Sequence, residues 1–353
     1  MSTYHETLKN EETLRLREVQ KELPPFLLEF FRGISQTTST KTRLAYAYDL
    51  RIFFRYLYEE HRVLGGIAPT ELKVEQLSEI TSEDIDCFME YLSFYIRADY
   101  ENPENAAELH NDEKGKSRKL AAIRSMYRFF YKKKKVEANP AAIVDTPKIH
   151  NKQIVRLDVN EMADFLDAVE SGGKLTDRQK LLHERTKKRD LAITTLLLGT
   201  GMRVSECVGI DIKDTDFKNN AIKIIRKGGN EVFLYFGEEV QAALENYLEE
   251  RQMAITKEPE EDALFLSSQG RRITVRAVQN LVKKYALGVT LKKISPHKLR
   301  STFGTNLYQE TGDIYLVADT LGHADVNTTK KHYAEIEDHR RRKAASFIKL
   351  RKD

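Results

Sequence analysis

One short region of the sequence carries a strong β-strand signal, and helical periodicity dominates the rest. Residues 221–225 and 232–236 are rich in β-branched and aromatic side chains and flank Gly228-Gly229, which predicts a hairpin with Lys227 at its tip. Elsewhere apolar residues recur every three or four positions, as in the segment after Thr42: Tyr46, Leu50, Phe53, Phe54 and Leu57. The pattern therefore predicts a mainly α fold with a small β-sheet.

A break in composition divides the chain near its middle. Asn139-Pro140 closes a helical half, and residues 145–155 have the proline-containing, polar composition of a linker. With 353 residues the chain is long enough for two domains. We expect a helical N-terminal domain over residues 1–150 and a second domain over residues 151–353, with a C-terminal tail from about residue 335.

Composition bounds the class of protein. Hydrophobic residues make up 41% and charged residues 32%, which is typical of a soluble globular protein, and we expect no membrane partner. The polar start lacks the apolar core of a signal peptide, and Cys87 and Cys207 are far apart, so we expect unpaired thiols and a cytoplasmic location. The net charge of +4 is compatible with nucleic acid but does not by itself indicate it.

A basic helix is predicted over residues 116–134. Its apolar stripe leaves four basic residues on what we expect to be an outer, phosphate-contacting face: Arg118, Lys119, Arg124 and Arg128. A simply solvated face is the alternative.

Residues 295–333 hold several polar side chains suited to handling a phosphodiester. Ser295-Pro296 is a helix-start signal, with the serine hydroxyl available as a cap, and it places His297 and Arg300 in a first helical turn. A second helix ends at Gly322 and delivers His323, and Tyr333 follows at short reach.

Arg203 lies upstream, after Gly199-Thr200-Gly201, at a predicted helix N-terminus that favours an anion. Two guanidiniums from separate helices could clamp a phosphate with planar donors.

These motifs resemble the signature of the tyrosine recombinase (integrase) family, and most closely its bacterial Xer-type members. The resemblance rests on Pro296-His297-Lys298-Leu299-Arg300, Leu321-Gly322-His323, Tyr333 and the Gly-Thr-Gly-x-Arg-x-Ser-Glu segment that ends at Glu206. Ser301 departs from it, since relatives often have a second histidine there. The resemblance implies a helical core-binding (SAM-like) DNA-binding domain followed by a mixed α/β catalytic domain. Residues 171–188 look like an insertion relative to the shortest members.

The resemblance also implies catalytic roles. Tyr333 would be the nucleophile that forms a 3′-phosphotyrosine, Lys227 the general acid, and His297 an aid to proton transfer near the tyrosine. The remaining residues of the expected site would neutralise the phosphate or support it: Arg203, Arg300, His323 and Glu206.

No cofactor or metal is expected for this chemistry. A zinc site built from His297, His323 and His332 is disfavoured, because no cysteine lies near and the spacing fits no common ligand set.

The implied function is site-specific recombination of double-stranded DNA at an inverted-repeat target, most consistent with chromosome dimer resolution by a nucleoid-associated enzyme. The expected assembly is a homotetramer on paired sites, in which C-terminal tails from about residue 335 are exchanged. An accessory host or element protein is left open as a further partner.

Three alternatives stay open at this point. One is an integrase or transposase of a mobile element or phage, another is a non-catalytic sequence-specific DNA-binding protein, and the third is a strand-relaxing topoisomerase.

Overall fold

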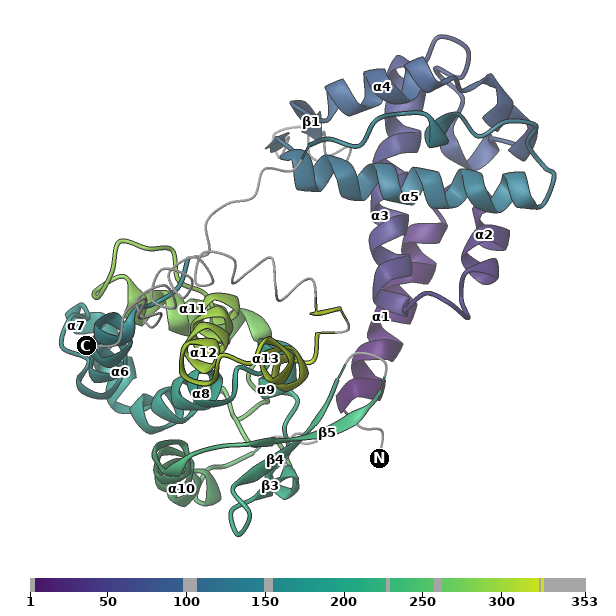
Figure 1. The fold of residues 1–353 in the computed structure, drawn as a ribbon. Helices are drawn as coiled ribbons and strands as arrows, with labels where there is room; N and C mark the ends of the chain where they lie inside the picture. Colours follow the sequence, from purple (N-terminus) through teal and green to yellow (C-terminus); the bar gives the residue numbers. More distant parts are fainter. Residues whose placement is uncertain are drawn as a thin grey trace, which may run out of the picture. The chain divides into compact units, whose positions relative to one another are not determined.

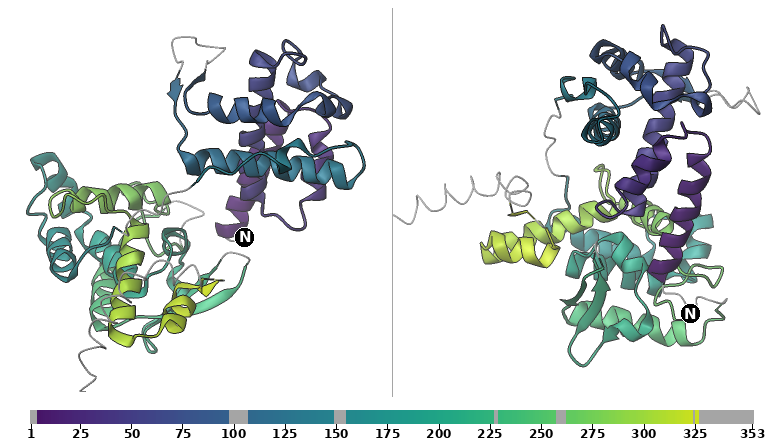
Figure 2. Two further views of the ribbon diagram at one scale, coloured as in Figure 1. Left: turned by 45° about the horizontal axis from the view of Figure 1, so that its top comes forward. Right: turned by 90° about the vertical axis from the view of Figure 1, so that its right-hand side faces the viewer.

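The structure is a computed structural model, and it describes residues 4–97, 107–148, 155–226, 229–256, 262–323 and 325–326. The chain divides into two compact units, residues 1–151 and 152–353. Figures 1 and 2 show helices dominating both units. The prediction of a mainly α chain with little sheet is confirmed.

The first unit is built from helices and one very short hairpin. Its elements are α1 (Tyr4–Gln20), α2 (Leu27–Gly33), α3 (Thr40–Glu60), α4 (Ser82–Tyr91), β1 (Tyr95–Arg97), β2 (Ala107–Leu109) and α5 (Glu113–Lys132), with 3-10 turns at Pro69–Glu71, Val74–Glu79 and Pro140–Ala142. Helix α3 packs against both α1 and α5. Aromatic side chains fill the core between them, as in the edge-to-face pairs Phe53–Phe88 and Phe26–Phe130.

Two sequence expectations for this unit are wrong in part. The polar stretch of residues 99–115 shows no periodicity and so predicts a loop, yet its residues 107–109 form β2, which pairs antiparallel with β1 in the register Tyr95↔Leu109. Strands of three residues are too short to show a period of two. Helix α5 also begins earlier than expected, because Asp112 Oδ1 accepts the Gly115 N–H at 2.8 Å and so caps the first turn.

Lys119 does not lie on the outer face of α5. It is 3% exposed, because positions 119, 123, 126 and 130 follow one helical stripe that faces the core. Its Nζ donates to Asn111 Oδ1 at 2.7 Å and lies 3.9 Å from Asp49 Oδ1. Burial raises the pKa of Asp49 to about 6, against the opposing effect of the two nearby cations, Arg118 and Lys119.

The second unit surrounds helix α8. Its elements are α6 (Val159–Ser171), α7 (Asp177–Glu184), α8 (Lys187–Thr200), α9 (Val204–Val208), a 3-10 turn (Ile212–Asp214), β3 (Thr215–Asp216), β4 (Ala221–Ile225), β5 (Glu231–Tyr235), α10 (Glu238–Gln252), α11 (Val275–Ala286), α12 (Pro296–Thr311) and α13 (Ile314–Leu321). Helix α8 packs against α6, α10 and α12, and after its charged first turn every residue from Ala192 to Leu198 is buried.

The predicted hairpin is present as part of a three-stranded antiparallel sheet with the order β3-β4-β5. Ala221 pairs with Tyr235 and Ile225 with Glu231. The Arg226 N–H donates to the Asn230 carbonyl at 2.8 Å, and the Gly229 N–H donates to the Arg226 carbonyl at 3.0 Å. The main chain of Arg226 is therefore held where the hairpin turns.

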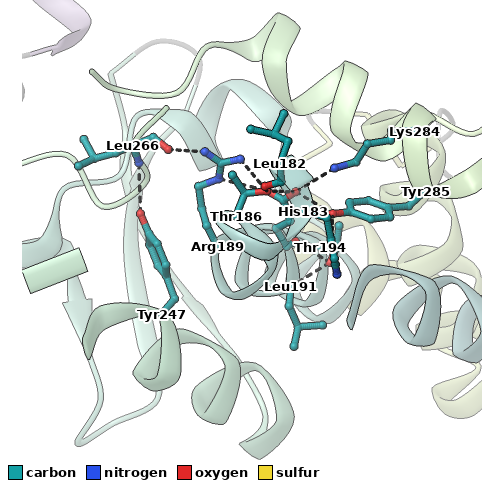
Figure 3. A network of polar contacts seen from close by, with 11 residues as sticks. Leu182, His183, Thr186, Arg189, Leu191, Thr194, Tyr247, Leu266, Lys284 and Tyr285 are labelled. Carbon is teal, nitrogen blue, oxygen red and sulfur yellow. Dashed lines mark hydrogen bonds and ion pairs between the residues drawn. The ribbon is translucent and has the colours of Figure 1, made fainter. Parts of the chain in front are cut away.

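Residues 171–188 contain α7, which a buried polar cluster ties to the helical core (Figure 3). The centre of this Asp190 cluster is the Asp190 carboxylate, whose Oδ1 accepts from Arg189 at 2.7 Å and whose Oδ2 accepts from the Tyr285 hydroxyl at 2.9 Å. Thr186 and Lys284 also reach Oδ2, at 3.1 and 3.3 Å. His183 on α7 joins through its Nδ1, 2.9 Å from the Tyr285 hydroxyl.

Candidate active site at the end of helix α13

Helix α13 presents His323 through a tightly defined end. Asp313 Oδ1 caps its start by accepting the N–H groups of Tyr315 and Leu316. At the other end Gly322 adopts a left-handed conformation with φ of +62°, while the N–H of His323 donates back to the Ala318 carbonyl at 2.9 Å. The sequence prediction that Gly322 ends this helix and delivers His323 is confirmed.

Arg203 reaches this helix end from the start of α9. Its Nη1 forms an ion pair with Glu206 Oε1 at 2.8 Å, and Glu206 Oε2 accepts the Arg203 N–H at 2.7 Å. Its Nη2 donates to the Gly322 carbonyl at 3.2 Å. Glu206 is 5% exposed and the Arg203 side chain is 37% exposed, so the carboxylate is a buried support for a guanidinium that solvent can reach.

Arg300 reaches the same helix end from α12. The Ser295 carbonyl accepts the N–H groups of Lys298 and Leu299, whereas the Ser295 hydroxyl makes no capping bond, contrary to expectation. Arg300 is buried, and it donates to the Gly201 carbonyl at 2.7 Å and to the Leu321 carbonyl. His297 lies one turn earlier and is exposed.

Arg226, at the end of β4, is a third arginine at this helix end, and sequence reasoning missed it. Its Nη1 donates to the Asp319 carbonyl at 3.3 Å and its Nη2 to the Thr320 carbonyl at 2.7 Å. Nothing in the local pattern distinguishes this residue from an ordinary basic residue at a strand end. Its partners lie 93 and 94 residues further along the chain, so only the tertiary structure reveals its place.

Together the three arginines satisfy the last carbonyls of α13, and we call Arg203, Arg226 and Arg300 the α13 cluster. Between them they donate to the carbonyls of residues 319–322, at a helix end where main-chain donors run out, although the Asp319 carbonyl also accepts the Gly322 N–H at 2.8 Å. The partial negative charge at a helix C-terminus favours cations there. A carbonyl dipole does not cancel a formal charge, so Arg203 and Arg300 can together hold an anion such as a phosphodiester next to His323.

Comparison with known proteins agrees with this chemistry. Residues 156–340 match the phage integrase family. The chain is 34% identical over 349 residues to tyrosine recombinase XerC of Caldanaerobacter subterraneus subsp. tengcongensis, covering 96% of this chain and 90% of that protein. It is 29% identical over 355 residues to tyrosine recombinase XerS of Streptococcus uberis, covering 92% and 95%.

The chain belongs to the phage integrase family of tyrosine recombinases. It is therefore an enzyme that cleaves and rejoins DNA.

Solved structures of tyrosine recombinases share the fold. The chain is similar to XerH site-specific recombinase in a post-cleavage complex with its palindromic difH substrate, with a TM-score of 0.61 at 19% identity, covering 96% of this chain and 94% of that one. It is also similar to a lambda integrase dimer bound to a core site, with a TM-score of 0.58 at 14% identity, covering 85% and 94%.

Two of the residues expected of a tyrosine recombinase lie outside the described residues. They are Lys227 and Tyr333, and the tail from about residue 335 also lies outside the described residues. The structure brings Arg203, Arg300 and His323 together with the supporting Glu206, and it places His297 on the first turn of α12. In the part of the chain that the structure describes, no group of three His, Cys, Asp or Glu side chains could hold a metal ion.

The basic residues predicted on α5 divide into different environments. Arg118 has a side chain that is 56% exposed and an ion pair with Asp49 at 2.8 Å, and Arg128 is exposed. Arg124 instead donates to the Ala141 carbonyl at 3.0 Å, to Thr146 Oγ1 at 2.7 Å and to the Val144 carbonyl. Its side chain therefore fastens the segment that follows α5.

No helix within the described ranges is long and apolar enough to span a membrane.

Proposed function

We propose that this recombinase cuts double-stranded DNA at a site built on the α13 cluster and passes through a 3′-phosphotyrosine intermediate at Tyr333. The observation that carries the proposal is the convergence of Arg203 and Arg300, from different helices, on the carbonyls that directly precede His323. Planar guanidiniums fixed in this way are suited to stabilise charge on the non-bridging phosphate oxygens.

The reaction needs one bond made and one broken at phosphorus. The Tyr333 oxygen forms a bond to phosphorus and its proton passes to His297 or to water, while the bond from phosphorus to the 5′ oxygen breaks. Lys227 donates the proton that the departing 5′ oxygen takes up. Because the covalent intermediate conserves a phosphodiester, a 5′ hydroxyl of another strand can reverse the step without ATP.

A nicked suicide substrate tests the nucleophile. Tyr333→Phe should bind target DNA like wild type yet form no covalent adduct on a denaturing gel, because only the nucleophilic oxygen is lost. An adduct that survives this substitution would contradict the assignment. Tyr315, which is 71% exposed, would then be examined before the buried Tyr308.

We further propose that the biological reaction is chromosome dimer resolution at a short inverted repeat, carried out in the cytoplasm on the nucleoid. Support comes from relatives named XerC and XerS that match over nearly their whole length. Mapping the DNA bound in cells tests this proposal. Binding near the replication terminus supports it, and binding at the ends of a mobile element would favour an integrase or transposase instead.

The expected assembly is a tetramer on two paired sites, coupled by exchange of tails. The tail carries Phe347, Ile348 and Leu350 at near-helical spacing after a basic run, which suits docking in a neighbouring subunit. Truncation after Asp338 should leave binding of one monomer to a half-site intact, weaken filling of the second half-site and abolish recombination. Normal cooperative binding and strand exchange by the truncated protein would exclude this role.

The first unit would supply phosphate contacts from α5. Replacement of Arg118 or Arg128 by alanine should weaken binding about equally for all sequences and reduce the salt slope of binding by about one each. Arg124→Ala is the matched control, since its guanidinium is committed to residues 141–146. A salt slope unchanged in both exposed variants would remove this helix from the interface.

A further inference from the structure

We propose that Arg226 is a positioning residue that sets the placement of the general acid Lys227 by tying the hairpin turn to the end of α13. The proposal rests on the function proposed above for Lys227. It assigns a role to a side chain that does not itself contact the reacting atoms.

The main chain of Arg226 belongs to the turn of the hairpin. Its N–H donates to the Asn230 carbonyl at 2.8 Å, and its carbonyl accepts the Gly229 N–H at 3.0 Å. Lys227 is the next residue in the chain, so its backbone nitrogen is bonded directly to the Arg226 carbonyl carbon. Any shift of Arg226 therefore shifts the start of Lys227.

The side chain of Arg226 belongs to the α13 cluster. Its two Nη atoms donate to two consecutive carbonyls, those of Asp319 and Thr320, just before the carbonyls to which Arg300 and Arg203 donate. A guanidinium can span two neighbouring acceptors with fixed geometry, whereas an ammonium is a single point of charge. This contact fixes the hairpin turn relative to the helix end that presents His323.

Close packing against Gly322 makes the tie more rigid. A Cβ at position 322 would lie 2.4 Å from Arg226 Nη1 and 2.5 Å from its Cζ, so the guanidinium lies directly on the glycine backbone. Glycine is thus needed at position 322 both for its φ of +62° and for the approach of Arg226.

The alternative is that Arg226 serves only the stability of α13, as a cap for orphan carbonyls. Lysine has a long, flexible side chain, so how well it donates a proton to one particular atom depends on the position of its backbone. An error of about 1 Å in the placement of a catalytic group can cost about 10²-fold in rate. The two roles are separable, because only a role through the acid disappears when the leaving group needs no proton.

The test measures the rate of covalent adduct formation on ordinary DNA and on DNA with a 5′-bridging sulfur, which leaves with little protonation. On ordinary DNA, Arg226→Ala should be slowed by up to about 10²-fold with DNA binding unchanged. Arg226→Lys should also be slowed, because it keeps the charge but loses the two-carbonyl contact. The sulfur substrate should return both variants to within a few-fold of wild type, as it should Lys227→Ala.

Lys223→Ala is the matched control on the same strand. Lys223 pairs with Asp214 at 3.6 Å and with Glu231 at 3.5 Å, so the cleavage rate of Lys223→Ala should stay at the wild-type level. Melting temperatures of all variants show whether the fold is kept, and rates are compared below the lowest of them.

Two results would overturn the proposal, and they differ. If the sulfur substrate rescues Lys227→Ala but not Arg226→Ala, or if Arg226→Ala cleaves ordinary DNA at the wild-type rate, the tie does not act through the acid while the proposed function stands. If Lys227→Ala is itself neither slowed nor rescued, the assignment of the acid fails and this proposal fails with it.

Discussion

The α13 cluster and the Asp190 cluster both gather basic side chains in the second unit, but they do so around different acceptors. In the Asp190 cluster, Arg189 and Lys284 converge on one carboxylate that is 2% exposed. At the end of α13, three guanidiniums contact four backbone carbonyls, and Glu206 supports Arg203. In the first arrangement a buried carboxylate neutralises the cations. In the second the guanidiniums contact neutral carbonyls, and the Arg203 side chain is 37% exposed.

The difference shows that a dense polar cluster is not by itself a sign of a catalytic site. The Asp190 cluster is richer in titratable groups, since it also includes His183 and Tyr285. Burial lowers the pKa of His183, assisted by the Lys284 charge, and raises that of Tyr285, assisted by the Asp190 charge. These pKa shifts follow from burial in a cluster that holds helices together. The exposure of the Arg203 side chain and the kind of acceptor therefore distinguish the two clusters better than perturbed pKa values do.

The largest expected effect is on catalysis at the α13 cluster. Arg203→Ala should lower the rate of adduct formation by about 10² to 10³-fold, the range for losing one donor to a developing charge. Arg203→Lys should recover little of it, because a lysine lacks the planar fork. The exposed Arg178 on α7 provides a control in which one positive charge is lost elsewhere. An equal fall in Arg178→Ala would mean that overall charge, and not the cluster, is being measured.

The Asp190 cluster should respond in stability and not in chemistry. Asp190→Asn leaves two partly buried cations without their carboxylate, and we expect the free energy of unfolding to fall by about 3 kcal/mol. Adduct formation per folded molecule should be unchanged below the melting temperature. Asp177→Asn on α7 is the control, since that carboxylate is fully exposed and its effect should be near zero. A folded Asp190→Asn protein that no longer cleaves DNA would erase the contrast between the clusters.

A smaller effect is expected from the pH dependence of stability. Because burial lowers the pKa of His183, the unfolded chain binds a proton there more readily than the folded one. The contribution of neutral His183 to the free energy of unfolding is therefore fully present above the ordinary pKa of about 6.5. It is lost as pH falls through the lower pKa of the folded state. Melting temperatures of wild type and His183→Gln between pH 8 and 5 should diverge in this sense, with the shallower slope in the variant. Parallel slopes would show that His183 is not the group responsible.

The smallest effect is expected at a partly exposed pair outside both clusters, Glu161 and Lys292. Desolvation raises the pKa of Glu161, but hydrogen bonds from Lys292, the Asp158 N–H and Thr290 outweigh this effect and hold that pKa at about 2. This contribution is present above the ordinary pKa of about 4.5 and is lost as pH falls toward 2. Lys292→Ala should cost under about 1 kcal/mol at neutral pH in a denaturant titration, since the pair is partly exposed. A loss as large as that of Asp190→Asn would mean that burial does not decide the size of these effects.

The sequence alone determined the elements whose causes are local. Asp158 followed three residues later by Glu161 is a capping-box pattern, and the structure has that box at the start of α6, with the Glu161 N–H donating to Asp158 Oδ1 at 2.8 Å. The strands flanking Gly228-Gly229 and the stop at Gly322 also follow from short-range rules of backbone conformation. The spacing of motifs near Arg203 and Arg300 was enough to indicate the family.

The tertiary structure decided which side chains share a site and which are buried. Lys119 lies on a core-facing stripe and Arg124 holds residues 141–146, although both look like exposed basic residues in the sequence. Arg226 became part of the candidate site because main-chain donors run out at the end of α13 and a distant strand end reaches its last carbonyls. Local patterns report backbone preferences within a few residues, whereas these contacts join positions about 20 to 94 residues apart, and so only the packed chain reveals them.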